Sequence, residues 1–121
     1  MLINLLLMSN EAYVQNKIRL AVGVGKVRLF RNNTGALLDQ SGRLIKFGLC
    51  KGSSDLIGFK TITITPDMVG RKVAVFSAIE VKDKGKTTVD QRNFINVINK
   101  SGGLAGVAKN VTDAKKILDI A

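Results

Sequence analysis

The feature that most constrains the fold is Val73–Lys82, a run of strand-forming residues that ends in two charges. Most of the run is small or apolar, which predicts a strand of a central sheet. Strand side chains alternate between faces, so Glu80 and Lys82 share one face while Val81 lies on the other. Charges are rare on a half-buried sheet unless ion pairing or metal binding offsets their cost, so the pair indicates a functional site.

A further charge, Asp55, opens a second apolar run, Asp55–Phe59, after a glycine-containing loop. Two carboxylates and an ammonium group at the ends of neighbouring strands can hold a divalent cation and an activated water. The chain has no histidine and one cysteine, Cys50, which excludes histidine-assisted nucleophiles and structural zinc. Any metal ion must therefore be held by oxygen, which favours Mg²⁺ or Mn²⁺.

The formal net charge is +10 over 121 residues, and both halves of the chain contribute to it. A folded basic surface of this kind favours nucleic acid as the partner, although an anionic membrane or a structural RNA-binding role also fits. Aromatic residues make up 5% of the chain and tryptophan is absent, which argues against a stacking platform for single-stranded bases. A single cysteine fits a reducing, intracellular setting.

The first eight residues, 1–8, are apolar but far too short to span a bilayer, which needs about 20 residues. They also lack the basic leader and the small-residue cleavage site of a signal peptide. We expect them to pack against a core or a second subunit.

Hydrophobic periodicity and capping residues predict one α/β domain, residues 1–121, on a mixed sheet. Thr88 and Gln91 have capping-box spacing, Gly102 follows the helix that they begin, and Thr112 is the expected cap of a last helix. The segment 43–47 is either a short strand or irregular. The expected elements are helix 10–22, strand 26–31, strand 56–65, a hairpin turn at 66–70, strand 73–81, helix 88–100, strand 104–109 and helix 112–118.

The order of these features resembles one known family. A helical glutamate (Glu11), Asp55 after its loop, the Glu80-Val81-Lys82 strand and Gln91 with Phe94 on the next helix are similar to the virus-type replication-repair nuclease (VRR-NUC) family. That family belongs to the PD-(D/E)xK nuclease superfamily. Short stand-alone members are typical of phages, which places the protein in the cytoplasm of a bacterial host.

The resemblance implies a restriction-endonuclease-like core, a mixed central sheet flanked by helices in α-β-β-β-α-β order. It also implies a Mg²⁺- or Mn²⁺-dependent DNA endonuclease. Asp55, Glu80 and the backbone carbonyl of Val81 would bind the metal, and Lys82 would orient the attacking water. Small viral members resemble homodimers that cut branched DNA such as four-way (Holliday) junctions.

Two of these residues have alternative roles. Glu11 is either a further metal ligand or a charge in the first turn of a helix, and Gln91 either positions water or Lys82 or only caps its helix. Glu-x-Lys alone is common by chance, so the site depends on the whole set of residues. The rival functions are a non-catalytic nucleic-acid-binding protein and a nuclease acting on RNA. The expected phosphate contacts come from basic residues flanking the site: Lys84 and Lys86 first, then Lys46, Arg43, Lys51, Arg31, Lys26 and Arg28.

Overall fold

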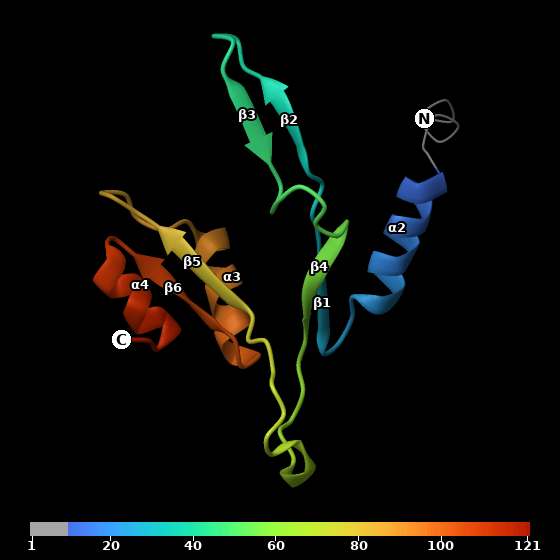
Figure 1. Ribbon diagram of the computed structural model, residues 1–121, viewed down its shortest axis with the longest axis vertical. Coiled ribbons are helices and arrows are strands. Elements are labelled where there is room, and N and C mark those ends of the chain that lie inside the picture. Colours follow the sequence, from blue (N-terminus) through green and yellow to red (C-terminus); the bar gives the residue numbers. More distant parts are fainter. Residues whose placement is uncertain (1–9) are drawn as a thin grey trace. The chain divides into compact units, whose positions relative to one another are not determined.

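The computed structural model describes residues 10–121, so the predicted N-terminal packing segment, 1–8, lies outside the described residues. Two compact units divide the chain, one ending at Ile62 and the other beginning at Thr63. Both units contain helix and strand (Figure 1), so the protein is a mixed α/β protein. The single domain expected over the whole chain stays a prediction. Within residues 10–121, no helix is long and apolar enough to cross a membrane.

The N-terminal unit begins with helix α2 (Asn10–Val22), which contacts strand β1 (Val27–Arg31). The helix ends where predicted, because Gly23 closes its last turn on the carbonyl of Arg19 at 3.0 Å. Strand β1 pairs antiparallel with β4 (Leu56–Lys60), in a register that runs from Val27 opposite Lys60 to Arg31 opposite Leu56. Asp55, the residue before Leu56, therefore lies at the end of this ladder.

A hairpin of β2 (Gly35–Leu38) and β3 (Leu44–Phe47) follows β1. The sequence left the second strand open and did not predict the first, because Gly-Ala-Leu-Leu carries little β-branched or aromatic character. Asp39 organises the turn by accepting hydrogen bonds from Ser41 and Arg43. The Ser41 hydroxyl, followed by the Arg43 backbone N–H, lowers the pKa of the Asp39 carboxyl below its usual value.

Helix α2 carries an apolar stripe at helical spacing that is only half covered. Val14, Ile18 and Val22 remain 49%, 44% and 51% exposed. The hairpin is also apolar and exposed, with Leu37 and Leu38 at 66% and 70%. Apolar surface on this scale favours association with another surface.

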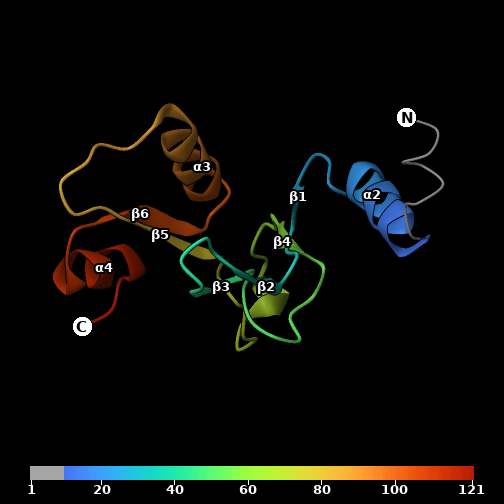
Figure 2. The same ribbon diagram turned by 90° about the horizontal axis from the view of Figure 1, so that it is seen from above.

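The C-terminal unit is built on two parallel strands, β5 (Ser77–Val81) and β6 (Leu104–Ala108). Helices α3 (Val89–Lys100) and α4 (Val111–Leu118) lie on opposite faces of this pair (Figure 2). Among the described residues, the buried apolar core consists of Ile98 on α3 and Ala108 on β6. Gly106 lets α4 approach closely, since a Cβ atom there would lie 2.8 Å from Cγ1 of Ile117.

The caps of both helices explain where they begin. The predicted capping box of α3 is confirmed: Gln91 N–H donates to the Thr88 hydroxyl at 3.1 Å, and Thr88 N–H donates to the Gln91 side chain at 2.9 Å. The cap predicted for α4 is wrong, because Asn110 accepts from the Asp113 N–H at 2.8 Å and Thr112 lies inside the helix. Asparagine is the stronger N-cap residue, so the helix begins earlier.

The hairpin expected between strands 56–65 and 73–81 would join the two units, and it stays a prediction. Strand β4 pairs with β1 and β5 pairs with β6, giving three two-stranded sheets among the described residues. The β1–β4 ladder stops at the bond from Thr61 N–H to the Lys26 carbonyl, because β1 begins there. Residues 66–68 form a 3₁₀ turn within the predicted turn 66–70. The restriction-endonuclease-like order of the sheet stays a prediction.

Candidate active site

Strand β5 carries the predicted pair of charges at its C-terminal end. Lys82 Nζ lies 3.7 Å from Glu80 Oε1, which confirms that both side chains lie on one face. They are partly withdrawn from solvent, at 21% exposure for the Lys82 side chain and 32% for Glu80. An ion pair in this setting is worth more than an exposed one, and it offsets part of the cost of placing charges on the sheet.

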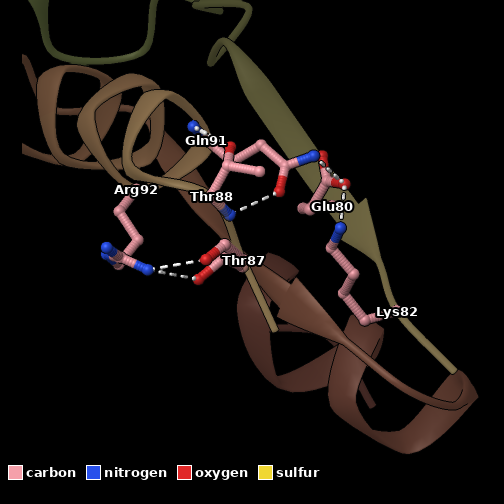
Figure 3. Close-up of polar contacts among 6 residues, drawn as sticks. All are labelled: Glu80, Lys82, Thr87, Thr88, Gln91 and Arg92. Atoms are coloured by element: carbon pink, nitrogen blue, oxygen red, sulfur yellow. Dashed lines mark hydrogen bonds and ion pairs between the residues drawn. The ribbon is translucent and has the colours of Figure 1, made fainter. Parts of the chain in front are cut away.

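Gln91, in the first turn of α3, joins this pair. Its side-chain amide donates from Nε2 to Glu80 Oε1 at 2.9 Å, while Oε1 of the same amide accepts the Thr88 N–H (Figure 3). The predicted capping role is thus confirmed, and the same side chain also contacts Glu80, while a role in positioning water or Lys82 stays a prediction. Both contacts are possible because a primary amide has separate donor and acceptor atoms. Thr88 and the start of α3 therefore fix the orientation of the Glu80 carboxylate.

Both contacts to Glu80 involve the same oxygen. Oε1 accepts from Gln91 and faces Lys82, while Oε2 has no hydrogen bond or ion pair within residues 10–121. Val81 is the last residue of β5, so its carbonyl lies at the same strand end. The unit therefore offers a carboxylate oxygen and a nearby backbone carbonyl, which are ligands that Mg²⁺ and Mn²⁺ accept.

The N-terminal unit brings together the other two predicted acidic residues. Asp55 and Glu11 line one open pocket of about 410 Å³ between α2 and the start of β4. Val14, Ile18 and Leu56 form the apolar part of its wall. Glu11 thus lies on the side of α2 that faces Asp55, and both residues are exposed to solvent.

The five predicted site residues fall into these two groups, each within its own unit. No cluster of three or more Asp, Glu, His or Cys side chains gathers in the part of the chain that the structure describes. Convergence of Asp55 with Glu80 on one metal ion stays a prediction.

The basic residues expected to contact DNA differ in their surroundings. Arg43 forms an ion pair with Asp39 at 3.1 Å, and Arg31 donates to the Asn16 side chain at 3.2 Å, so part of their hydrogen-bonding capacity is engaged. A second group is exposed and makes no ion pair within the described chain: Lys46, Lys51, Lys84 and Lys86.

One residue near the site was missed at the sequence level. Asn32 lies in the segment 32–35, whose residues are typical of a turn, yet it is 7% exposed and its side chain contacts the loop that leads to Asp55. The signal was a pair of asparagines, Asn32 and Asn33, directly after a strand, which is also the ordinary pattern of a turn.

The protein is thus a mixed α/β protein in which an ammonium group and an amide both contact one carboxylate at the end of β5. The chain matches the VRR-NUC domain over residues 30–112, which is more than half its length, and it belongs to that family. Membership implies a nuclease-type function, with DNA as the substrate. The match includes Asp55, Glu80, Lys82 and Gln91 but begins after Glu11. No curated protein and no solved structure matches the chain.

Proposed function

We propose that this protein is a divalent-metal-dependent DNA endonuclease that hydrolyses phosphodiester bonds, with its chemistry centred on Glu80 and Lys82. The observation that supports this most strongly is the hydrogen bond from Gln91 to Glu80 Oε1. That bond and the contact with Lys82 hold one oxygen of the carboxylate in place and leave Oε2 available. A carboxylate oriented in this way needs little reorganisation to bind a cation.

The donor set fits a hard cation. Glu80 Oε2 and the Val81 carbonyl would hold Mg²⁺ or Mn²⁺, with Asp55 as the second carboxylate and Glu11 as a further ligand. When bound, such an ion neutralises charge on the scissile phosphate and lowers the pKa of a coordinated water. Lys82 supplies a positive charge where negative charge develops, and Gln91 keeps Glu80 in the orientation that the site needs.

A plasmid-nicking assay tests the proposal. The protein is expected to nick supercoiled DNA with Mg²⁺ or Mn²⁺ and to lose this activity in EDTA. Glu80→Gln should reduce turnover by about 10²-fold or more, since it removes the carboxylate charge, while DNA binding is retained. Asp83→Asn is the matched control, because Asp83 is an exposed acidic residue on the loop next to the site and its loss should leave the rate unchanged. Equal rates for Glu80→Gln and the parent protein in Mn²⁺ would exclude this assignment.

Substrate choice and assembly extend the proposal. We propose that the enzyme acts as a homodimer on branched DNA such as four-way junctions, since two sites related by a two-fold axis suit paired cuts in a symmetric junction. The exposed apolar side chains on the β2–β3 hairpin and on α2 support self-association. Sedimentation at micromolar concentration, together with cleavage of matched junction, flap, linear duplex and RNA substrates, tests it. A strict monomer, or equal cutting of linear and branched DNA, counts against it.

The rival function is a basic nucleic-acid-binding protein without catalysis. The charge of +10 fits it equally well, but it gives no reason for the contact of Gln91 with Glu80. Tight, salt-sensitive DNA binding without cleavage in any divalent metal would select it.

A further inference from the structure

We propose that Asn32 is a positioning residue that fixes the place of Asp55 through the loop before it. This inference rests on the proposed function, because it assigns Asp55 a role in metal binding. Asn32 is the one buried polar residue found within residues 10–121, at 7% exposure, and it lies directly after the end of β1. A buried amide is costly unless its donors and acceptor are satisfied, so its partners show what it does.

All the partners of Asn32 lie on one loop, residues 48–55. The side-chain oxygen accepts the Leu49 N–H at 2.9 Å near the start of the loop. The side-chain nitrogen donates to the Ser53 hydroxyl at 2.7 Å and to the Ser54 carbonyl at 2.9 Å near its end. The Asn32 backbone N–H donates to the Asp55 carbonyl at 2.8 Å. Asn32 thus holds both ends of the loop, and its backbone adds one hydrogen bond to the β1–β4 ladder at Asp55.

We call these hydrogen bonds of Asn32 the clamp, and the composition of the loop explains why it is needed. It contains two glycines with positive φ, Gly48 at 86° and Gly52 at 84°, and it has no proline. Glycine adds conformational freedom that folding must remove. The Ser53 hydroxyl, which accepts from Asn32, also donates to the Cys50 carbonyl at 2.7 Å and so links the clamp to the middle of the loop. Without the Asn32 side chain, the loop would keep the bonds between Ser53 and Cys50 but would lose the side-chain bonds that tie its two ends to β1.

The consequence concerns the Asp55 carboxylate in the pocket that it shares with Glu11. A ligand whose backbone is held in one conformation binds a cation without first losing conformational freedom. Loss of the Asn32 clamp should therefore weaken metal binding while the protein remains folded and still binds DNA.

Two variants test the clamp. Asn32→Asp keeps the shape and the acceptor of the side chain but removes both N–H donors. Ser53→Ala removes one partner of Asn32 without adding charge, so it still tests the clamp if Asn32→Asp fails to fold. The control is Asn99→Ala. Asn99 likewise makes two hydrogen bonds to backbone, with Ala105 at 3.0 and 2.9 Å, but in the other unit.

Two measurements on the full chain are needed. Hydrogen exchange of residues 48–55 in metal-free protein is expected to quicken at least about tenfold in Asn32→Asp and Ser53→Ala, and to stay unchanged in Asn99→Ala. The dissociation constant for Mn²⁺ alone, from titration calorimetry, is expected to rise about 10- to 100-fold in the first two variants only.

Unchanged Mn²⁺ affinity in both clamp variants overturns the inference, even if the loop exchanges faster, because Asn32 would then be a structural residue only. A parent protein that binds no Mn²⁺ overturns it together with the proposed metal site. A parent protein that binds Mn²⁺ and cuts no DNA refutes the proposed nuclease, while weaker Mn²⁺ binding in the variants still supports the role of Asn32.

Discussion

Gln91→Glu separates the two roles of Gln91. Glutamate keeps an oxygen that can accept the Thr88 N–H, so the capping box survives, and a negative charge suits the first turn of a helix. It cannot donate to Glu80, so the 2.9 Å hydrogen bond that orients the carboxylate is replaced by a contact between two negative charges. The helix should remain intact while the site is disturbed.

The size of the effect follows from two contributions. A hydrogen bond to a charged group is worth about 1.5–3 kcal/mol, and partial exposure of Glu80 places this one near the lower end. Two unit charges about 3 Å apart repel by about 1.4 kcal/mol even at the dielectric constant of water. Because about 1.4 kcal/mol corresponds to a factor of ten, nicking in Mg²⁺ should slow roughly 10- to 100-fold. Repulsion between the carboxylates should also shift the activity profile towards higher pH.

Thr88→Ala is the matched control, because it removes the cap and leaves the Gln91 amide free to contact Glu80. Loss of an N-cap costs about 1 kcal/mol, which lowers Tm by about 4 °C in a protein of this size. Plasmid nicking and thermal unfolding measured on both variants should give opposite patterns. The reasoning is refuted if Gln91→Glu cuts DNA at the parent rate, or if both variants lose only stability.

Three further predictions follow from single contacts. Lys82→Met should reduce turnover about 10²-fold with little change in DNA affinity, whereas Lys84→Met should mainly weaken binding and lower its salt dependence; filter binding and nicking at two salt concentrations distinguish them. Asp39 should titrate below its usual pKa by NMR, because the Ser41 hydroxyl stabilises the charged form. Its contribution to stability is then present above the unfolded pKa and disappears as the pH falls through the lower folded pKa, and a normal pKa would contradict this. Gly106→Val should destabilise the protein by about 1–3 kcal/mol in thermal unfolding, because its Cβ would collide with Ile117; an unchanged Tm would mean that α4 shifts freely.

Local sequence signals predicted the charged strand end and the helix beside it. The alternation through Glu80 and Lys82 requires only that the segment be a strand, and the spacing of Thr88 and Gln91 requires only that a helix begin there. Both are properties of a few consecutive residues. The structure confirms them for this reason, with the ion pair on β5 and the capping box of α3.

Strand pairing could not be predicted in the same way, because a strand shows its own periodicity but not its partner. The turn at Pro66 suggested a hairpin between the segments on either side, but no sequence signal indicated that β4 pairs with β1 or that β5 pairs with β6. The extent to which the apolar side chains of α2 are buried could not be predicted for a related reason. The stripe through Val14 and Ile18 is apolar with helical spacing, but the surface that would cover it fully is not specified by the helix itself.

The contrast between Gln91 and Asn32 shows which site residues a sequence can supply. Gln91 was found because a second constraint, the capping box, restricted its place on α3, and the structure then added the contact with Glu80. The Asn32 side chain makes three hydrogen bonds against two for Gln91, yet its partners begin 17 residues away, at Leu49, and no short-range spacing links them. An amide that serves a neighbouring helix turn can be recognised from its spacing, whereas an amide that closes a distant loop becomes visible only when the folded chain brings the two together. For a site of this kind, a structure is therefore needed above all for the residues that position a site side chain through a distant loop, as Asn32 does.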